Sequence, residues 1–247
     1  MMSSRTRLKI VAKLPPRASA LLADIENWSG RSVQFAPNPR PLSALDPNPF
    51  AAACELDETN ATIFYRDVNA LSDNGIVHEL LHIHRYWVEG IPQLVPISAD
   101  ERHWKLTSEI EGALEHLIIV PRELDFCPNR PGYWAETARN NWGRYPWPDV
   151  EDTWVRRKFC LLGRLNIEFV DEPVVRNFVK ECLKREGMFG QAQQFARDIR
   201  RKMRLSKVQA LIRTVDQLDM PLNKLKLLYI DPRTGTVRHE NLCAKIQ

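Results

Sequence analysis

The sequence predicts an α+β fold in which a short sheet with its helices is followed by a mainly helical C-terminal region. The chain has 247 residues, and 44% of them are hydrophobic, which is enough to bury a sizeable core. The segment Thr62-Ile63-Phe64-Tyr65 in the first half is β-branched and aromatic, as is typical of a strand. After Val150 the pattern turns helical and stays so until Pro221. Strands followed by a run of helices indicate the α+β class.

Helix and strand signals divide the first half of the chain. Prolines mark the start of a first helix and Gly30 its end, while Gly90 and Pro92 end a second helix. A segment with five prolines lies between them and is expected to be an irregular connection. The expected elements are a helix at residues 15–29, a strand at 32–35, the connection at 37–49, a strand at 62–65 and a helix at 76–89.

A third helix is expected to begin near Ser98 and to end at Val120, because Pro121 stops it. Residues 128–148 are expected to be an ordered loop that wraps the core or covers a substrate, pinned by Trp134, Trp142 and Trp147. Three helices should follow, at residues 173–185, 191–204 and 206–220. A terminal hairpin is expected after them, at residues 225–235. The expected regions are a first domain at 1–127, a Trp- and Pro-rich connection at 128–150 and a helical region at 151–247.

Composition and charge exclude several classes of protein. The longest apolar runs, such as Leu117 to Val120, are far shorter than the ~20 residues that cross a bilayer, so no membrane segment is expected. The basic N-terminus has no apolar stretch behind it, which predicts no signal peptide and a cytoplasmic location. Five scattered cysteines are then expected to be reduced thiols. A net charge of +4 is too small for an organised nucleic-acid surface, so nucleic acid is not an expected partner.

The motif that carries chemistry is His78-Glu79-Leu80-Leu81-His82, on the second expected helix. Residues four apart lie on one face of a helix, so both imidazoles can reach one ion, and zinc binds histidine nitrogens at ~2.0–2.1 Å. Glu79 projects about 100° around the helix axis from His78. It can therefore lie beside the metal and take a proton from the water that the metal activates. We expect a Zn²⁺ site here, with Glu79 as the general base.

The same residues also fit an ordinary surface helix whose histidines are solvated. A chance match to this motif in a chain of this length is expected on the order of one time in a hundred. A strand precedes the helix and a glutamate-rich segment follows it, and both features favour a metal site over the surface helix.

A catalytic zinc site needs a third protein ligand and an open fourth position. Val88 stands where a further motif histidine would lie, so a glutamate from a later helix is expected. Glu109 and Glu111 are the candidates, and their directions differ by about 200°, so only one of them can face the metal. Glu109 shares a side of its helix with His116, which is expected at the surface or as a hydrogen-bond donor to a ligand carboxylate.

Residues 78–82, the segment Glu109 to Ala113 and the apolar run that ends in Pro121 resemble the ImmA/IrrE-type metallopeptidases, small zinc peptidases of the gluzincin group. That family shows Glu-x-Glu-Ala-Asn before such a run, and the resemblance implies Glu109 as the third ligand. Gly112 and Ala113 stand here in place of Ala-Asn, which leaves Glu111 open as the alternative. The resemblance covers roughly residues 15–125 and implies a minimal zincin-like fold and a protein substrate.

The residues and the resemblance together predict a zinc metallopeptidase that hydrolyses peptide bonds of a protein or peptide substrate. The alternative is a non-catalytic regulatory protein with a zincin fold, acting through C-terminal helices that bind a protein partner. The basic run Arg197 to Arg204 on those helices is interpreted as a solvated charged face. Near the motif, we expect His84 to be a satisfied core histidine and Tyr86 to pack or to donate to a developing oxyanion.

Overall fold

The computed structural model describes residues 4–38, 52–69, 71–98, 101–128, 130–144 and 152–245. Helices predominate in these residues and two small sheets accompany them, which confirms the α+β class. The chain divides into two compact units. The first unit comprises Met1–Ile91, Asp125–Cys127 and Tyr229–Arg238, and the second comprises Pro92–Leu124, Pro128–Leu228 and His239–Gln247. Each unit is therefore assembled from more than one stretch of sequence.

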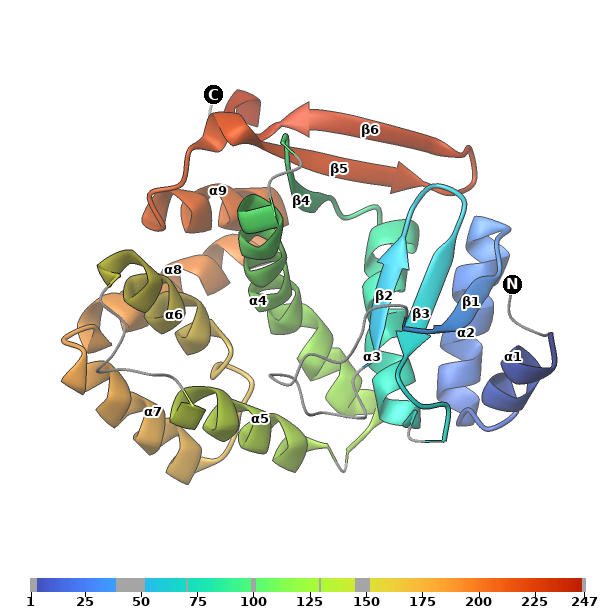
Figure 1. The fold of residues 1–247 in the computed structure, drawn as a ribbon, viewed down its shortest axis with the longest axis horizontal. Coiled ribbons are helices and arrows are strands. Elements are labelled where there is room, and N and C mark those ends of the chain that lie inside the picture. The colour runs from blue at the N-terminus through green and yellow to red at the C-terminus, as the bar shows by residue number, and fades with distance from the viewer. Residues whose placement is uncertain are drawn as a thin grey trace. The chain divides into compact units, whose positions relative to one another are not determined.

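A three-stranded sheet with the order β1-β3-β2 is the framework of the first unit (Figure 1). Its strands are β1 (Val33–Pro37), β2 (Ala53–Leu56) and β3 (Ala61–Tyr65). β3 is parallel to β1 and antiparallel to β2, so β2 is an edge strand. The two expected strands are confirmed, whereas β2 was not expected. Most of the proline-rich connection expected at 37–49 lies outside the described residues.

Helices α1 (Ser4–Val11), α2 (Pro16–Ser29) and α3 (Asp73–Ile83) complete the first unit, and α3 packs against α2, β2 and β3. Gly30 ends α2 with φ 66°, a left-handed conformation that glycine adopts without a Cβ clash. The Glu26 carboxylate holds this corner, because it accepts hydrogen bonds from Arg7 at 2.6 Å and from the Val33 N–H at 2.7 Å. The expected helix at 15–29 is thus confirmed and joined directly to the sheet.

Helices make up most of the second unit, and Figure 1 shows them along the chain from α4 to α9. They are α4 (Glu101–Phe126), α5 (Pro131–Arg144), α6 (Thr153–Leu165), α7 (Pro173–Arg185), α8 (Phe189–Leu205) and α9 (Lys207–Gln217). α8 packs against α6, α7 and α9, and α7 also packs against α5. The three helices expected between residues 173 and 220 are confirmed, because each buries a regular apolar stripe.

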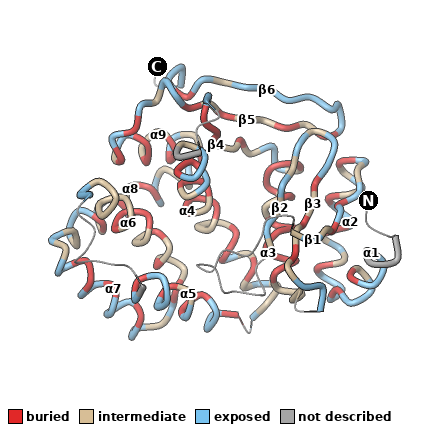
Figure 2. The backbone as a smooth tube through the Cα atoms, in the orientation of Figure 1, coloured by how far each residue is buried: buried red, intermediate tan, exposed pale blue. Residues whose placement is uncertain are grey.

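A second sheet has the order β4-β5-β6 and consists of β4 (Gln93–Pro96), β5 (Leu225–Asp231) and β6 (Thr236–Asn241). β4 was not expected and pairs antiparallel to β5. The expected hairpin is confirmed: Asp231 begins its turn by accepting a hydrogen bond from the Arg233 N–H at 3.0 Å. β6 is the exposed edge of this sheet along nearly its whole length (Figure 2).

The expectation that Pro121 stops the third helix is wrong, because α4 continues through it to Phe126. Proline removes one helical hydrogen bond and costs ~3 kcal/mol inside a helix. Here Pro121 is exposed, while Ile119, Val120 and Glu123 around it are fully buried. Burial of the apolar Ile119 and Val120 before the proline, and the ion pair of Glu123 with Arg130 at 2.6 Å after it, offset its local cost.

The expectation of an ordered loop at 128–148 is also wrong for residues Pro131–Arg144, which form helix α5. Trp134, Ala138 and Trp142 recur at intervals of four residues and are buried, so the helical period was present but was outweighed by the high proline, glycine and asparagine content. Trp147 lies outside the described residues.

All five cysteines are free thiols, as expected. In the described part of the chain, no helix is both long and apolar enough to cross a membrane.

Candidate metal centre

Helix α3 presents the His78–His82 motif, and its first turn is fixed by a local cap. The Ser72 hydroxyl accepts a hydrogen bond from the Gly75 N–H at 3.1 Å, which satisfies one of the donors that a helix start leaves unpaired. Every residue from Gly75 to Leu81 is buried (Figure 2). α3 is therefore an internal helix, and the alternative of solvated histidines on a surface helix is wrong for His78.

The two motif histidines lie one helical turn apart with their rings close together. Their ring centroids are 4.9 Å apart and the ring planes meet at 80°. His78 is 8% exposed, and His82 is half-buried. Burial and the regular helix thus hold two nitrogen donors side by side, as the spacing predicts.

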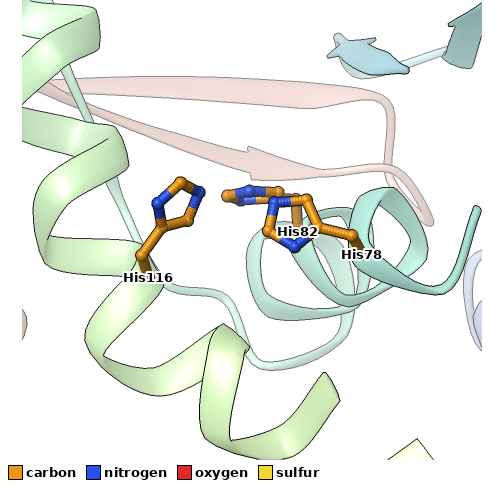
Figure 3. A group of neighbouring side chains, drawn as sticks. All are labelled: His78, His82 and His116. Carbon is orange, nitrogen blue, oxygen red and sulfur yellow. The ribbon is translucent and has the colours of Figure 1, made fainter. Parts of the chain in front are cut away.

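A third imidazole belongs to the same group. The ligand nitrogens of His78, His82 and His116 of α4 all lie within 4.8 Å of one another (Figure 3). Among the residues that the structure describes, this is the one group of three or more histidine, cysteine or acidic side chains placed in this way. Imidazole nitrogens bind zinc, copper, nickel and iron, and three of them leave a fourth tetrahedral position open. The three residues are therefore positioned to hold a metal ion.

The orientation of His116 is set by aromatic neighbours within the second unit. Its ring centroid lies 5.4 Å from that of Trp134 and 6.4 Å from that of Phe169, and these two rings pack edge-on against each other at 5.4 Å. The imidazole is half-buried against this pair. His116 was expected at the surface or beside a ligand carboxylate, and the structure places it instead among the candidate ligands.

Glu79 is 7% exposed and lies against the edge strand β2. The Cys54 thiol of β2 lies within hydrogen-bonding reach of the Glu79 carboxylate. Enclosure of the thiol by protein and the nearby Glu79 charge raise the pKa of Cys54 well above its ordinary value, so the thiol stays protonated and remains a donor. A buried carboxylate needs such a partner, because an unpaired one is costly to desolvate.

The chain beyond α3 widens into a π-helical turn, His84–Val88, in which the Glu89 N–H donates to the His84 carbonyl at 3.0 Å. Single π-turns often mark functional sites in helices. Tyr86 in this turn is buried, and its ring lies nearly parallel to that of His82, with centroids 6.2 Å apart. The turn thus supports the His82 ring, and packing is the role of Tyr86 that these contacts favour.

His84 is half-buried and its two ring nitrogens lie 3.2 Å from the carboxylates of Glu89 and Asp24. It is satisfied, as expected, but at the edge of the unit rather than in its core.

The two glutamates expected as third ligand make other contacts and do not join the group of histidines. Glu109 forms an ion pair with Lys158 of α6. Glu111 is buried, lies 2.8 Å from the Lys207 ammonium and accepts a hydrogen bond from the Leu94 N–H. A Cβ added at Gly112 would meet no described atom within 4 Å.

The sequence did contain a signal for His116. Glu109 and His116 are seven residues apart, which is two helical turns, so they lie on the same side of α4 about 10.5 Å apart along its axis. Helical spacing alone did not decide between this side and the side of Glu111, which lies about 200° around the axis from Glu109.

No family model, curated protein sequence or solved structure with which the chain was compared matches it.

Proposed function

We propose that this protein is a zinc-dependent peptidase that hydrolyses peptide bonds of a protein or peptide substrate, with His78, His82 and His116 as its zinc ligands. The observation that carries the proposal is on α3 alone. The ring centroids of His78 and His82 are 4.9 Å apart, and Glu79, which follows His78, is buried. This combination supplies nitrogen ligands and an adjacent base on one rigid element.

The donor set fits zinc. Three neutral imidazoles with one open position are a known arrangement for catalytic zinc. When bound, zinc supplies Lewis-acid chemistry, lowering the pKa of a coordinated water towards ~7 and polarising a carbonyl oxygen.

Glu79 is proposed to accept a proton from the attacking water and to deliver it to the departing amine. Its burial supports this role, because few solvent molecules compete for the carboxylate. The Cys54 thiol is proposed to donate to the same carboxylate and so to help hold the base in one orientation.

The test combines metal analysis with a cleavage assay on the full chain. Purified protein should contain about one zinc ion per chain and should cut a mixed peptide library, with new termini identified by mass spectrometry. Glu79→Gln should keep the zinc and lower kcat by about 10²- to 10⁴-fold, because it removes the proton acceptor alone. Glu136→Gln, which changes an exposed glutamate of α5, is the matched control and should leave cleavage unchanged.

Two results would contradict the proposal. Cleavage that persists in Glu79→Gln would show that Glu79 is not the base. Wild-type protein that binds zinc but cuts no peptide would favour the alternative of a non-catalytic regulatory protein.

A further inference from the structure

A cavity of ≈ 550 Å³ lies within the second unit, where the end of α6 meets helices α7 and α8. Its volume is that of a typical small-molecule site, ~300–1,000 Å³. Ile167, Val179 and Leu183 line it and are buried, so part of its wall is apolar and rigid. None of its lining residues belongs to the candidate metal centre, and the proposed peptidase chemistry makes no use of it.

The charged lining of this cavity is strongly unbalanced. Five cations line it: Arg164, Arg176, Lys180, Arg197 and Arg200. The one carboxylate in the lining is that of Glu168. Five positive charges against one negative charge leave an excess of +4, which equals the net charge of the whole chain. The basic run of α8, interpreted from the sequence as a solvated face, therefore contributes two of its arginines to a concave site.

Helical spacing explains how the cations gather on the cavity. Arg176 and Lys180 are four residues apart on α7 and so share one face. On α8, Gln193, Arg197 and Arg200 follow one another at intervals of four and three residues, which also places them on one face. Both helices turn these faces to the same cavity, since all five residues line it.

Three of the five cations already form ion pairs. Arg164 lies 2.5 Å from the Glu168 carboxylate, which also forms an ion pair with Arg200. Arg176 donates to the Val170 carbonyl at 2.5 Å and lies 3.6 Å from Asp171.

Lys180 and Arg197 differ from the other three cations. Among the residues that the structure describes, neither has a carboxylate within ion-pair distance. The Lys180 ammonium lies 5.7 Å above the Phe189 ring, and Arg197 donates to the Gln194 amide oxygen at 2.8 Å. These two cations are therefore available to an anion that enters the cavity.

We infer that this cavity binds a small organic phosphate of about nucleotide size. Guanidinium and ammonium groups are strong charge-assisted donors to phosphate oxygens, so Lys180 and Arg197 hold the phosphate group. The carbon part of the ligand lies against the apolar wall and the half-buried Phe189 ring. A half-open cavity of this volume fits one small molecule, whereas a nucleic-acid strand would require a basic stripe that continues along the surface.

The test measures binding by isothermal titration calorimetry on the full chain, with adenosine monophosphate, inorganic phosphate and adenosine as probes. Adenosine monophosphate should bind, inorganic phosphate should bind more weakly, and adenosine should not bind at matched concentrations. The double variant Lys180→Gln/Arg197→Gln should weaken binding of adenosine monophosphate by about tenfold or more, because both charged donors are lost. Neither substitution orphans a carboxylate, and an unchanged thermal midpoint would show that the variant folds.

Lys202→Gln is the matched control. Lys202 is on α8, as Arg197 is, and also carries one positive charge, but it does not line the cavity. Its loss should leave the affinity within about twofold.

Three results would overturn the inference. The first is no binding of either phosphate probe at concentrations up to about 10 mM. The second is equal binding to the double variant and to the wild type. The third is a single-stranded oligonucleotide that binds more tightly than adenosine monophosphate and loses affinity in the double variant, which would assign these cations to a surface for a polymer.

Discussion

The ammonium of Lys207 on α9 lies 2.8 Å from the Glu111 carboxylate of α4, and both side chains are nearly inaccessible to solvent. The same ammonium lies 2.8 Å from Glu115, one turn further along α4. Glu111 also accepts a hydrogen bond from the Leu94 N–H of β4. One lysine thus joins two carboxylates, and the cluster ties α4 to α9 and to the second sheet. The carboxylate that the sequence offered as an alternative metal ligand is engaged in this structural contact.

Replacing Lys207 should destabilise the protein strongly. Lys207→Met leaves two buried carboxylates without this cation, and breaking a buried ion pair in that way costs ~3–5 kcal/mol. The free energy of unfolding in urea measures the effect. Lys158→Met is the comparison, because its ion pair with Glu109 is partly exposed and should be worth less than about 1 kcal/mol. Equal losses in the two variants would contradict this account.

The stability of the protein should depend on pH through Glu111. Burial raises the pKa of the Glu111 carboxyl above its ordinary value, and the Glu115 charge acts in the same direction, against Lys207 and the Leu94 N–H. The folded chain then binds this proton more tightly than the unfolded chain. Ionising Glu111 therefore costs stability, and that cost grows as pH rises from the ordinary carboxyl pKa, ~4.3, to the raised value.

Glu111→Gln should remove this dependence while keeping an oxygen that accepts from Leu94. The free energy of unfolding should fall more between about pH 4 and about pH 7 for the wild type than for the variant. An identical pH profile for the two proteins would show that Glu111 ionises normally in the folded state.

Zinc affinity should identify the third ligand. If His116 binds the ion, His116→Ala should weaken zinc binding by at least about 100-fold, since changes in residues that merely support a ligand already cost ~10–100-fold. Glu109→Ala should change the affinity by less than about threefold, because its carboxylate pairs with Lys158. Competition with a chromophoric chelator measures both. The reverse ranking would support the ligand implied by the family resemblance.

Cys54 should influence catalysis without influencing the metal. Cys54→Ala removes the donor to Glu79, and a loosely held base should lower kcat by about 10- to 100-fold. Cys54→Ser retains a hydroxyl donor and should recover most of that loss, which a purely structural role of the sulfur would not predict. Zinc content should be the same in both variants. A serine variant as impaired as the alanine variant would exclude the hydrogen bond as the cause.

Gly163 of α6 is required by its contact with Trp142 of α5. A Cβ at position 163 would lie 2.9 Å from Cζ2 of the buried indole, so Gly163→Ala should cost ~1–3 kcal/mol through overpacking. Gly112→Ala on α4 is the control, because its Cβ would meet nothing within 4 Å and alanine favours a helix by ~0.5–1 kcal/mol. The midpoint of chemical denaturation should therefore fall in Gly163→Ala and rise in Gly112→Ala. A stabilised Gly163→Ala variant would mean that the two helices separate easily.

The elements that the sequence predicted well are those whose signals are local. α2 begins at a proline and ends at Gly30, and α7 has a proline start and a continuous apolar stripe. The short strands β2 and β4 were missed because each has only four residues and is defined by its pairing with a partner strand. Pro121 misled the prediction for the opposite reason, since its local penalty is offset by buried neighbours that only the folded chain brings together.

At the candidate site, residue spacing was enough to predict the pair on α3. His78 and His82 meet because four residues make about one helical turn, and Glu79 takes its place from the same geometry. The surroundings of that pair became visible only in the folded chain. It buries Glu79 beside a thiol from β2, commits Glu111 to Lys207, and groups His116 rather than Glu109 with the two imidazoles. Helical periodicity fixes the direction of a side chain around its helix axis, but it leaves open which turn of one helix lies level with another.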